Sequence, residues 1–201
     1  YSFQSDLVTS PGRSQIYDYY TYSGLDRDCK LQTESISNWL TVPDSSKAVL
    51  DEFCKEADLT GTVAEIVQKL AAYYQDNIPY TYQPGITPYG QDFVSYFLKK
   101  NRRGYCAHFA SAATLLLRNC GIPARYVEGY AIDPEDIGEN GKILTDQKVS
   151  DYYQGYRGLA DTGVVQVDVT DANAHAWVEI YDHHKGWYVV DITPASDQEE
   201  A

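Results

Sequence analysis

The stretch NRRGYCAHFASAATLLLRNCGIPAR, residues 101–125, contains an apolar helical pattern that begins at a cysteine. From Cys106 onward, apolar residues recur at steps of three and four, as they do on the buried face of a helix. These residues are Phe109, Ala110, Ala113, Leu116, Leu117 and Cys120. Gly121 and Pro123 follow as a stop signal. The sequence therefore predicts a largely buried helix with Cys106 in its first turn.

The first turn of a helix is an unusual place for a thiol. Unpaired backbone N–H groups and the helix dipole favour an anion there, which lowers the pKa of a cysteine and makes it nucleophilic. The same amides can bind the oxyanion of a tetrahedral intermediate. The alternative is that Cys106 is a small apolar residue that only packs in the core. The helix pattern alone favours neither interpretation.

A nucleophilic cysteine needs a base, and the chain contains four histidines. His108 is two residues beyond Cys106, about 200° around a helix, so it points away and is expected to be a packed or capping residue. His183 and His184 lie in the charged turn DHHKG and are expected to be solvated. His175 remains as the candidate base.

His175 opens the alternating run HAWVEIY, residues 175–181, and a second run, GWYVVDIT, covers residues 186–193. If the residues between Tyr181 and Trp187 form a hairpin loop, Trp177 lies opposite Asp191 and His175 is its diagonal neighbour on the same face. A slip of one residue would move Asp191 to the other face. The alternative is a half-buried hairpin with a strand-end histidine and a solvated aspartate. Asp191 weighs against it, because a carboxylate inside an apolar strand needs a partner.

Helices precede strands along the rest of the chain, which predicts the α+β class. One helix is expected over residues 44–57, and a second begins at Thr62, where Thr62 and Glu65 fit a capping box. A short helix is expected around Phe93, ending in the basic run KKNRR. Besides the two hairpin runs, the expected strands are residues 124–132 and the run VVQVDVT, residues 164–170.

The predicted organisation is a single domain. Residues 1–43 are expected to form an irregular segment packed on the core, and residues 44–201 the catalytic domain. Residues 133–163 are a Gly- and Asp-rich excursion between strands. The length of 201 residues suits one sizeable core. The chain begins at Tyr1 and has no methionine, which suggests a mature product or a segment of a longer protein.

Composition narrows the classes of partner. The formal net charge of -13 disfavours nucleic acid and suits a cationic or amine-bearing partner. No apolar stretch reaches the roughly 18 to 20 residues of a membrane helix. The four cysteines show no CxxC pair and no zinc-ligand spacing, so we expect no metal site and no cofactor. If Cys106 is the nucleophile, at most two of the other three cysteines can pair within the chain.

Three sequence blocks together resemble the core of the transglutaminase-like family. They are RGYCAHFASAATLLLRNCGIPARYVEGY, NAHAWVEIY and GWYVVDITP, in that order, and the resemblance covers about residues 73–195. It implies an α+β, papain-like fold in which a thiol helix packs on an antiparallel sheet. It also implies a catalytic triad of Cys106, His175 and Asp191.

The resemblance implies a thioester mechanism. Cys106 attacks a glutamine carboxamide or peptide carbonyl, His175 transfers the protons and Asp191 orients the imidazole. The acyl group then passes to an amine, such as a lysine, or to water. An upstream side chain often completes the oxyanion site in this family, and Tyr82 or Gln83 is the candidate here. Trp177 is expected to be a core or cleft-wall residue first and a substrate contact second.

Several alternatives stay open. The animal cross-linking enzymes of this family are longer and bind calcium, whereas this chain has no run that resembles a calcium loop. Arg125 is expected to be structural. Many bacterial members carry this domain outside the cell on a membrane-anchored parent, so an extracellular or cell-surface location is expected, with a protein or peptide substrate. The other functions considered are a cysteine endopeptidase acting on peptide or cell-wall bonds and a catalytically silent binding module.

Overall fold

The structure of the chain is a computed structural model that describes residues 33–132, 137, 141–143, 165–183 and 186–194. The chain divides into two compact units. The first comprises residues 1–128 and 176–201, and the second residues 129–175. None of the described helices is both long and apolar enough to cross a lipid bilayer.

The first unit contains all the described helices except the short 3-10 helix η3 (Asp171–Asn173) of the second unit. They are α1 (Thr33–Asn38), α2 (Asp44–Glu56), α3 (Val63–Asn77), α4 (Phe93–Tyr96), the π-helix η2 (Phe97–Asn101) and α5 (Cys106–Asn119). The two helices expected from residue 44 and from Thr62 are confirmed as α2 and α3. The Thr62 amide donates to Glu65 Oε2 at 2.7 Å and the Glu65 amide to Thr62 Oγ1 at 3.3 Å, so the predicted capping box is present.

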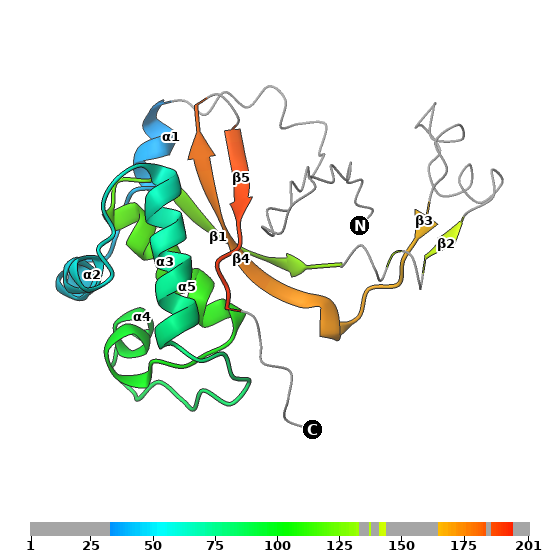
Figure 1. Cartoon of the computed structure of the whole chain (residues 1–201), viewed down its shortest axis with the longest axis horizontal. Helices are drawn as coiled ribbons and strands as arrows, with labels where there is room; N and C mark the ends of the chain where they lie inside the picture. The colour runs from blue at the N-terminus through cyan, green and yellow to red at the C-terminus, as the bar shows by residue number, and fades with distance from the viewer. Residues whose placement is uncertain (1–32, 133–136, 138–140, 144–164, 184–185, 195–201) are drawn as a thin grey trace. The chain divides into compact units, whose positions relative to one another are not determined.

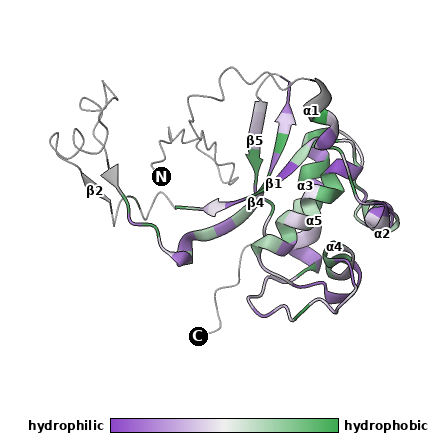
Figure 2. Ribbon diagram, turned by 180° about the vertical axis from the view of Figure 1, so that it is seen from behind, coloured by the Kyte–Doolittle hydropathy of each residue, from purple (hydrophilic) through white to green (hydrophobic). Residues whose placement is uncertain are grey.

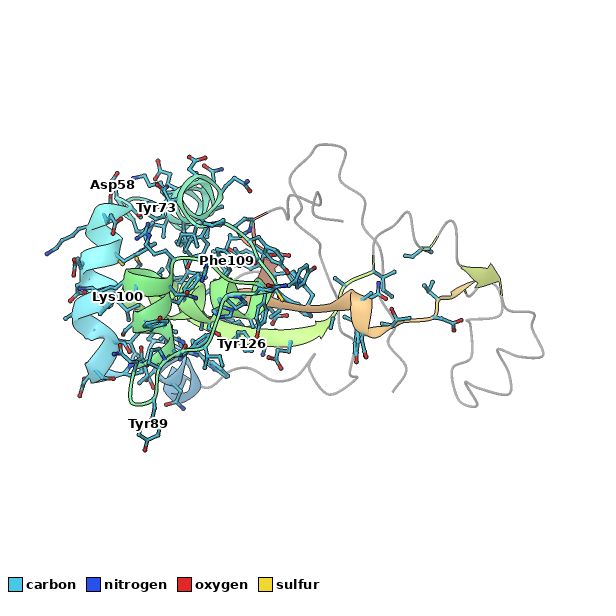
Figure 3. The ribbon with its side chains drawn as sticks, turned by 90° about the horizontal axis from the view of Figure 1, so that it is seen from below. Asp58, Tyr73, Tyr89, Lys100, Phe109 and Tyr126 are labelled. Carbon is cyan, nitrogen blue, oxygen red and sulfur yellow. The ribbon has the colours of Figure 1, made fainter. Side chains whose placement is uncertain are left out.

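The predicted thiol helix is confirmed as α5, and it is the centre of the core. Its fully buried residues are Phe109, Ala112, Ala113, Leu116 and Leu117. The ribbon of α5 is mostly in the colours of hydrophobic residues (Figure 2). Phe109 lies inside the helical unit, whereas Tyr89 projects from it into solvent (Figure 3).

The helix α5 ends as the sequence predicts. Gly121 has φ +79°, its amide donates to the Arg118 carbonyl at 2.9 Å, and the Ile122 amide donates to the Leu117 carbonyl at 2.9 Å. This pair of bonds is the Schellman arrangement, which needs a left-handed residue and therefore favours glycine.

A three-stranded sheet has the order β1 (Ala124–Tyr130), β4 (Ala174–Asp182) and β5 (Gly186–Val190). The helices of the first unit gather on one side of β5 and the neighbouring part of β4 (Figure 1). The expected α+β class is confirmed.

The hairpin of β4 and β5 has the predicted register, because Tyr181 pairs with Trp187. Pairing continues to Asp182 and Gly186, which shortens the expected loop. One expectation was wrong: β5 ends at Val190, so Asp191 follows the strand instead of lying within it. There the Asp191 carboxylate accepts a hydrogen bond from the Thr193 amide at 3.0 Å, as aspartates do at the ends of elements.

The second unit contains a small antiparallel sheet of β2 (Lys142–Ile143) and β3 (Val165–Gln166), followed by the 3-10 turn η3 (Asp171–Asn173). The strand expected over residues 164–170 is thus shorter than the run VVQVDVT. Most of the excursion at 133–163 and all of residues 1–32 lie outside the described residues. A helix, α1, occupies part of the 1–43 segment that was expected to be irregular. The predicted domain boundaries stay predictions.

Candidate functional site

Cys106 is the first residue of α5, as predicted. Its N-cap residue, Tyr105, is extended (φ -116°, ψ -179°) and makes no side-chain cap, and the first turn holds no acidic side chain. The thiol is half-buried and packs against the core. The amides of the first turn therefore act on Cys106 without a competing carboxylate from the helix itself.

A backbone pairing fixes the approach to Cys106. Tyr80 and Gly104 form a parallel bridge, in which the Thr81 amide donates to the Gly104 carbonyl at 2.7 Å and the Gly104 amide to the Pro79 carbonyl at 3.3 Å. A Cβ atom at Gly104 would lie 2.6 Å from Cβ and Cγ of His108. Only glycine fits here, because a Cβ would overlap the first turn of α5.

The bridge brings the phenol of Tyr80 to the thiol helix. The backbone amide of Cys106 donates a hydrogen bond to the Tyr80 phenolic oxygen, and this phenol also bonds with that of Tyr82. Burial, the Tyr82 bond and the negative charge of a Cys106 thiolate raise the pKa of Tyr80 far above its usual range. Tyr80 is therefore a neutral phenol near neutral pH.

A second phenol, that of Tyr126 on β1, also lies close enough to Cys106 for a thiolate there to affect its pKa. The pKa of Tyr126 is raised, first by burial, then by its hydrogen bond to the Glu128 carboxylate, and further by the charge of a Cys106 thiolate. Tyr80 and Tyr126 are thus uncharged phenols near the thiol.

Tyr80 was missed in the sequence analysis, which selected Tyr82 and Gln83. Tyr82 is 77% exposed, and its ring packs edge-on against Tyr80 with centroids 5.3 Å apart. Gln83 is also exposed, and its amide donates to Thr81 Oγ1 at 3.1 Å. The alternation of tyrosines in PYTYQP was the available signal, because residues two apart in an extended segment share a face.

His108 is a packed residue, as predicted. It is 6% exposed, and its ring lies 4.8 Å from Phe93, 5.6 Å from Phe97 and 4.6 Å from Tyr105 between centroids. Burial lowers its pKa. His183 is exposed, also as predicted, and His184 lies outside the described residues.

The other members of the predicted triad belong to different units. His175 is a half-buried residue at the start of β4 and ends the second unit, whereas Cys106 and Asp191 belong to the first. Trp177 follows on β4 and is half-buried. The triad of Cys106, His175 and Asp191 therefore stays a prediction, as do the substrate roles of Tyr82, Gln83 and Trp177.

Arg125 has the contacts expected of a structural residue. Its Nε donates to Glu179 Oε2 at 2.6 Å, which ties β1 to β4. Its guanidinium also lies 4.4 Å from the ring centroid of Trp187 on β5. The Glu179 side chain is only 12% exposed, so Arg125 compensates a mostly buried charge.

These features define a class of protein: an α+β domain with a half-buried thiol at the start of its central helix. No group of three or more His, Cys, Asp or Glu side chains arranged to hold a metal occurs among the described residues. A family model, described as the transglutaminase-like superfamily, matches residues 51–192. The chain belongs to this superfamily.

Two bacterial relatives match parts of the chain. The Bacillus subtilis (strain 168) protein YebA is 35% identical over 105 residues, which cover 51% of this chain and 11% of YebA. A Pseudomonas aeruginosa protein named protein-glutamine gamma-glutamyltransferase is 32% identical over 149 residues, which cover 74% of this chain and 18% of that protein. The chain thus spans less than a fifth of either relative.

Solved structures of the periplasmic domain of TgpA from Pseudomonas aeruginosa share the fold. The ethylmercury-bound form has a TM-score of 0.54 and 27% identity, with 81% of this chain and 50% of that chain covered. A second structure of the same domain also has a TM-score of 0.54 and 27% identity, and 48% of it is covered.

Proposed function

We propose that this chain is a thiol-dependent acyl transferase or hydrolase that acts on glutamine carboxamides or peptide bonds. The observation that carries the proposal is the position of Cys106 at the N-terminal end of α5, where no acidic side chain of the first turn opposes a thiolate. Membership of the transglutaminase-like superfamily supports it. His175 is the proposed base and Asp191 its orienting partner.

The reaction proceeds in two steps. The Cys106 thiolate attacks the carboxamide carbon and forms a C–S bond, while the carbonyl oxygen becomes an oxyanion. When this intermediate collapses, the C–N bond breaks and protonated His175 gives its proton to the departing amide nitrogen, which leaves as ammonia. A primary amine or water then attacks the thioester, His175 accepts its proton, and the thiolate leaves.

The oxyanion has two proposed donors. One is the backbone amide of Cys106, which at present donates to the Tyr80 oxygen. The other is the Tyr80 hydroxyl, which stays protonated because its pKa is raised. Removing one donor of this kind from an enzyme typically costs about 10²- to 10³-fold in rate, or less where another donor remains. Tyr82 acts through its hydrogen bond to Tyr80, and Gln83 and Trp177 are proposed substrate contacts.

Transfer to an amine is favoured over hydrolysis as the main reaction. The name of the Pseudomonas aeruginosa relative, protein-glutamine gamma-glutamyltransferase, supports this choice. The charge of -13 also suits a cationic amine. We place the domain outside the cytoplasm, because the similar domain of TgpA is periplasmic.

The test uses a blocked glutaminyl-glycine peptide with and without a fluorescent primary amine. We expect incorporation of the amine with release of ammonia, and slower ammonia release when water is the only acceptor. Cys106→Ala is the inactive control, and Cys120→Ala, on the same helix, is the matched cysteine control. Cleavage of the peptide bond without ammonia release would establish the endopeptidase alternative. No reaction with a panel of glutaminyl peptides and proteins would favour the silent binding module.

A further inference from the structure

A pair of cysteines lies at the other end of α5. Cys54 is on α2, and Cys120 is the C-cap residue of α5. Their Sγ atoms are 3.7 Å apart, although the two residues are 66 positions apart in the sequence. Both side chains are half-buried. The two sulfurs are thus in contact without a bond between them.

Polar neighbours hold this pair in place. Asn119 Nδ2 lies 3.6 Å from Cys54 Sγ and also donates to Asp51 Oδ1 at 2.9 Å. The Lys47 ammonium donates to Asn119 Oδ1 and Asp51 Oδ1, both at 2.7 Å. The Cys120 thiol points toward the Leu59 carbonyl at 3.9 Å. The Lys47, Asp51 and Asn119 bonds connect α2 with the end of α5 beside the thiols.

The same contacts give the two sulfurs different acidities. The hydrogen bond from Cys120, followed by that from Asn119, lowers the pKa of Cys54 to about 7 against the opposing effect of burial. The bond to Cys54 and burial raise the pKa of Cys120. Cys54 is therefore the nucleophilic member and Cys120 the resolving member.

We infer that Cys54 and Cys120 form a reversible disulfide that fastens α2 to the C-terminal end of α5. A disulfide bond is about 2.05 Å long, so the sulfurs must approach each other by roughly 1.6 Å. Rotation of two half-buried side chains can supply much of this movement. Besides Cys106 the chain has three cysteines, of which at most two can pair with each other. The contact between Cys54 and Cys120 identifies that pair.

The chemistry needs an oxidant, and a low-molecular-weight disulfide such as oxidised glutathione is sufficient. The Cys54 thiolate attacks one of its sulfurs and releases one glutathione thiolate, which takes up a proton. Cys120 then loses its proton and attacks the Cys54 sulfur, which releases the second glutathione. Two protein thiols are oxidised and one glutathione disulfide is reduced to two thiols. A surface hollow lined by Asp51, Cys54, Lys55, Asp58, Leu59 and Thr60 gives access.

The proposed disulfide and the proposed catalytic thiol lie far apart on α5. Cys106 and Cys120 lie at opposite ends of a 14-residue helix, about 20 Å apart along its axis. The bond would anchor the helix that carries Cys106 without involving the Cys106 thiol. This inference does not depend on the proposed catalytic function, since it concerns only the folded state.

The experiment uses the Cys106→Ala variant, so that the outcome is independent of catalysis. The protein is equilibrated with reduced and oxidised glutathione, alkylated, digested with trypsin without reduction, and mapped. Each remaining cysteine falls in its own peptide, Asp28–Lys30, Ala48–Lys55 or Asn119–Arg125. We expect a linked pair of Ala48–Lys55 with Asn119–Arg125, the loss of two thiols, and a melting temperature about 10 °C higher.

One further variant and one further measurement make the test decisive. The Cys54→Ser and Cys120→Ser double variant should show no change of melting temperature with glutathione. In the reduced Cys106→Ala protein, alkylation of Cys54 should be half-maximal near pH 7. Glutathione attached to Cys54 without a linked peptide, a bond to Cys29, or a dimer linked between chains would each overturn the inference.

Discussion

The two ends of α5 carry the same side chain in opposite surroundings. Cys106 begins the helix beside the neutral phenols of Tyr80 and Tyr126, and its own backbone amide, which belongs to the first turn, donates to the Tyr80 oxygen. Cys120 caps the other end, where the carbonyls of the last turn disfavour an anion, and its neighbour is the thiol of Cys54. One end suits acyl chemistry and the other suits a disulfide.

This difference shows that a cysteine's role is set by its helix position and neighbours. Cys106 and Cys120 are both half-buried and both contact the core, so burial does not distinguish them. The two cysteines differ in the groups that contact them: phenols lie near Cys106, whereas the thiol of Cys54 contacts the Cys120 sulfur. Matched substitutions, one at each end of α5, can therefore distinguish the roles of Cys106 and Cys120.

The largest expected effect is on activity. Cys106→Ala should lower turnover at least 10³-fold, because the proposed thioester forms on the Cys106 sulfur. Cys120→Ala should leave the turnover rate within about twofold of the parent rate, since Cys120 lies a full helix length from Cys106. Both should melt within a few degrees of the parent protein under reducing conditions. Initial rates of ammonia release and melting curves measure both effects. A Cys106→Ala protein that keeps a tenth of the activity would disprove the assignment.

The second prediction compares the glycines that flank α5. Gly104→Ala should destabilise the protein by about 1–3 kcal/mol, because the new Cβ would overlap the buried His108 side chain. Gly121→Ala meets no atom within 4 Å but must adopt φ +79°, which costs about 1–2 kcal/mol. Urea unfolding measures both losses.

The activities of the two glycine variants should diverge further than their stabilities. Gly104→Ala displaces the first turn of α5 and with it Cys106, so we expect at least a tenfold loss of rate at a temperature where both variants are folded. Gly121→Ala should retain the parent rate. Equal loss of activity in both variants would mean that stability alone explains the effect.

The sequence predicts the local features of this molecule well. The bounds of α5, its Schellman end at Gly121 and the capping box of Thr62 and Glu65 depend on residues within a few positions of each other. The register of the β4–β5 hairpin was also predicted, because a short loop leaves few pairings that keep the apolar face buried.

Features that depend on distant segments were missed. The contact of Tyr80 with the Cys106 amide depends on the parallel bridge between Tyr80 and Gly104, which no local pattern encodes. The count of cysteines allowed one internal pair without indicating Cys54 and Cys120. The run VVQVDVT alternates like a long strand, yet β3 is only Val165–Gln166, where it pairs with the two residues of β2. An alternating pattern predicts which residues share a face of a strand, but it does not provide the neighbouring strand with which they must pair.

The smallest expected effect concerns the phenol at the start of α5. Tyr80→Phe removes the hydroxyl that accepts from the Cys106 amide but keeps the ring, which stacks on Phe109 with centroids 6.3 Å apart. We expect kcat to fall about tenfold with little change in KM, since a donor to the oxyanion acts in the transition state. Tyr82→Phe, which removes only the hydrogen bond to Tyr80, should lower kcat less than threefold. A rise in KM at constant kcat for Tyr80→Phe would instead make Tyr80 a substrate contact. The backbone amide of Cys106 would then be the one proposed oxyanion donor that remains at this end of α5.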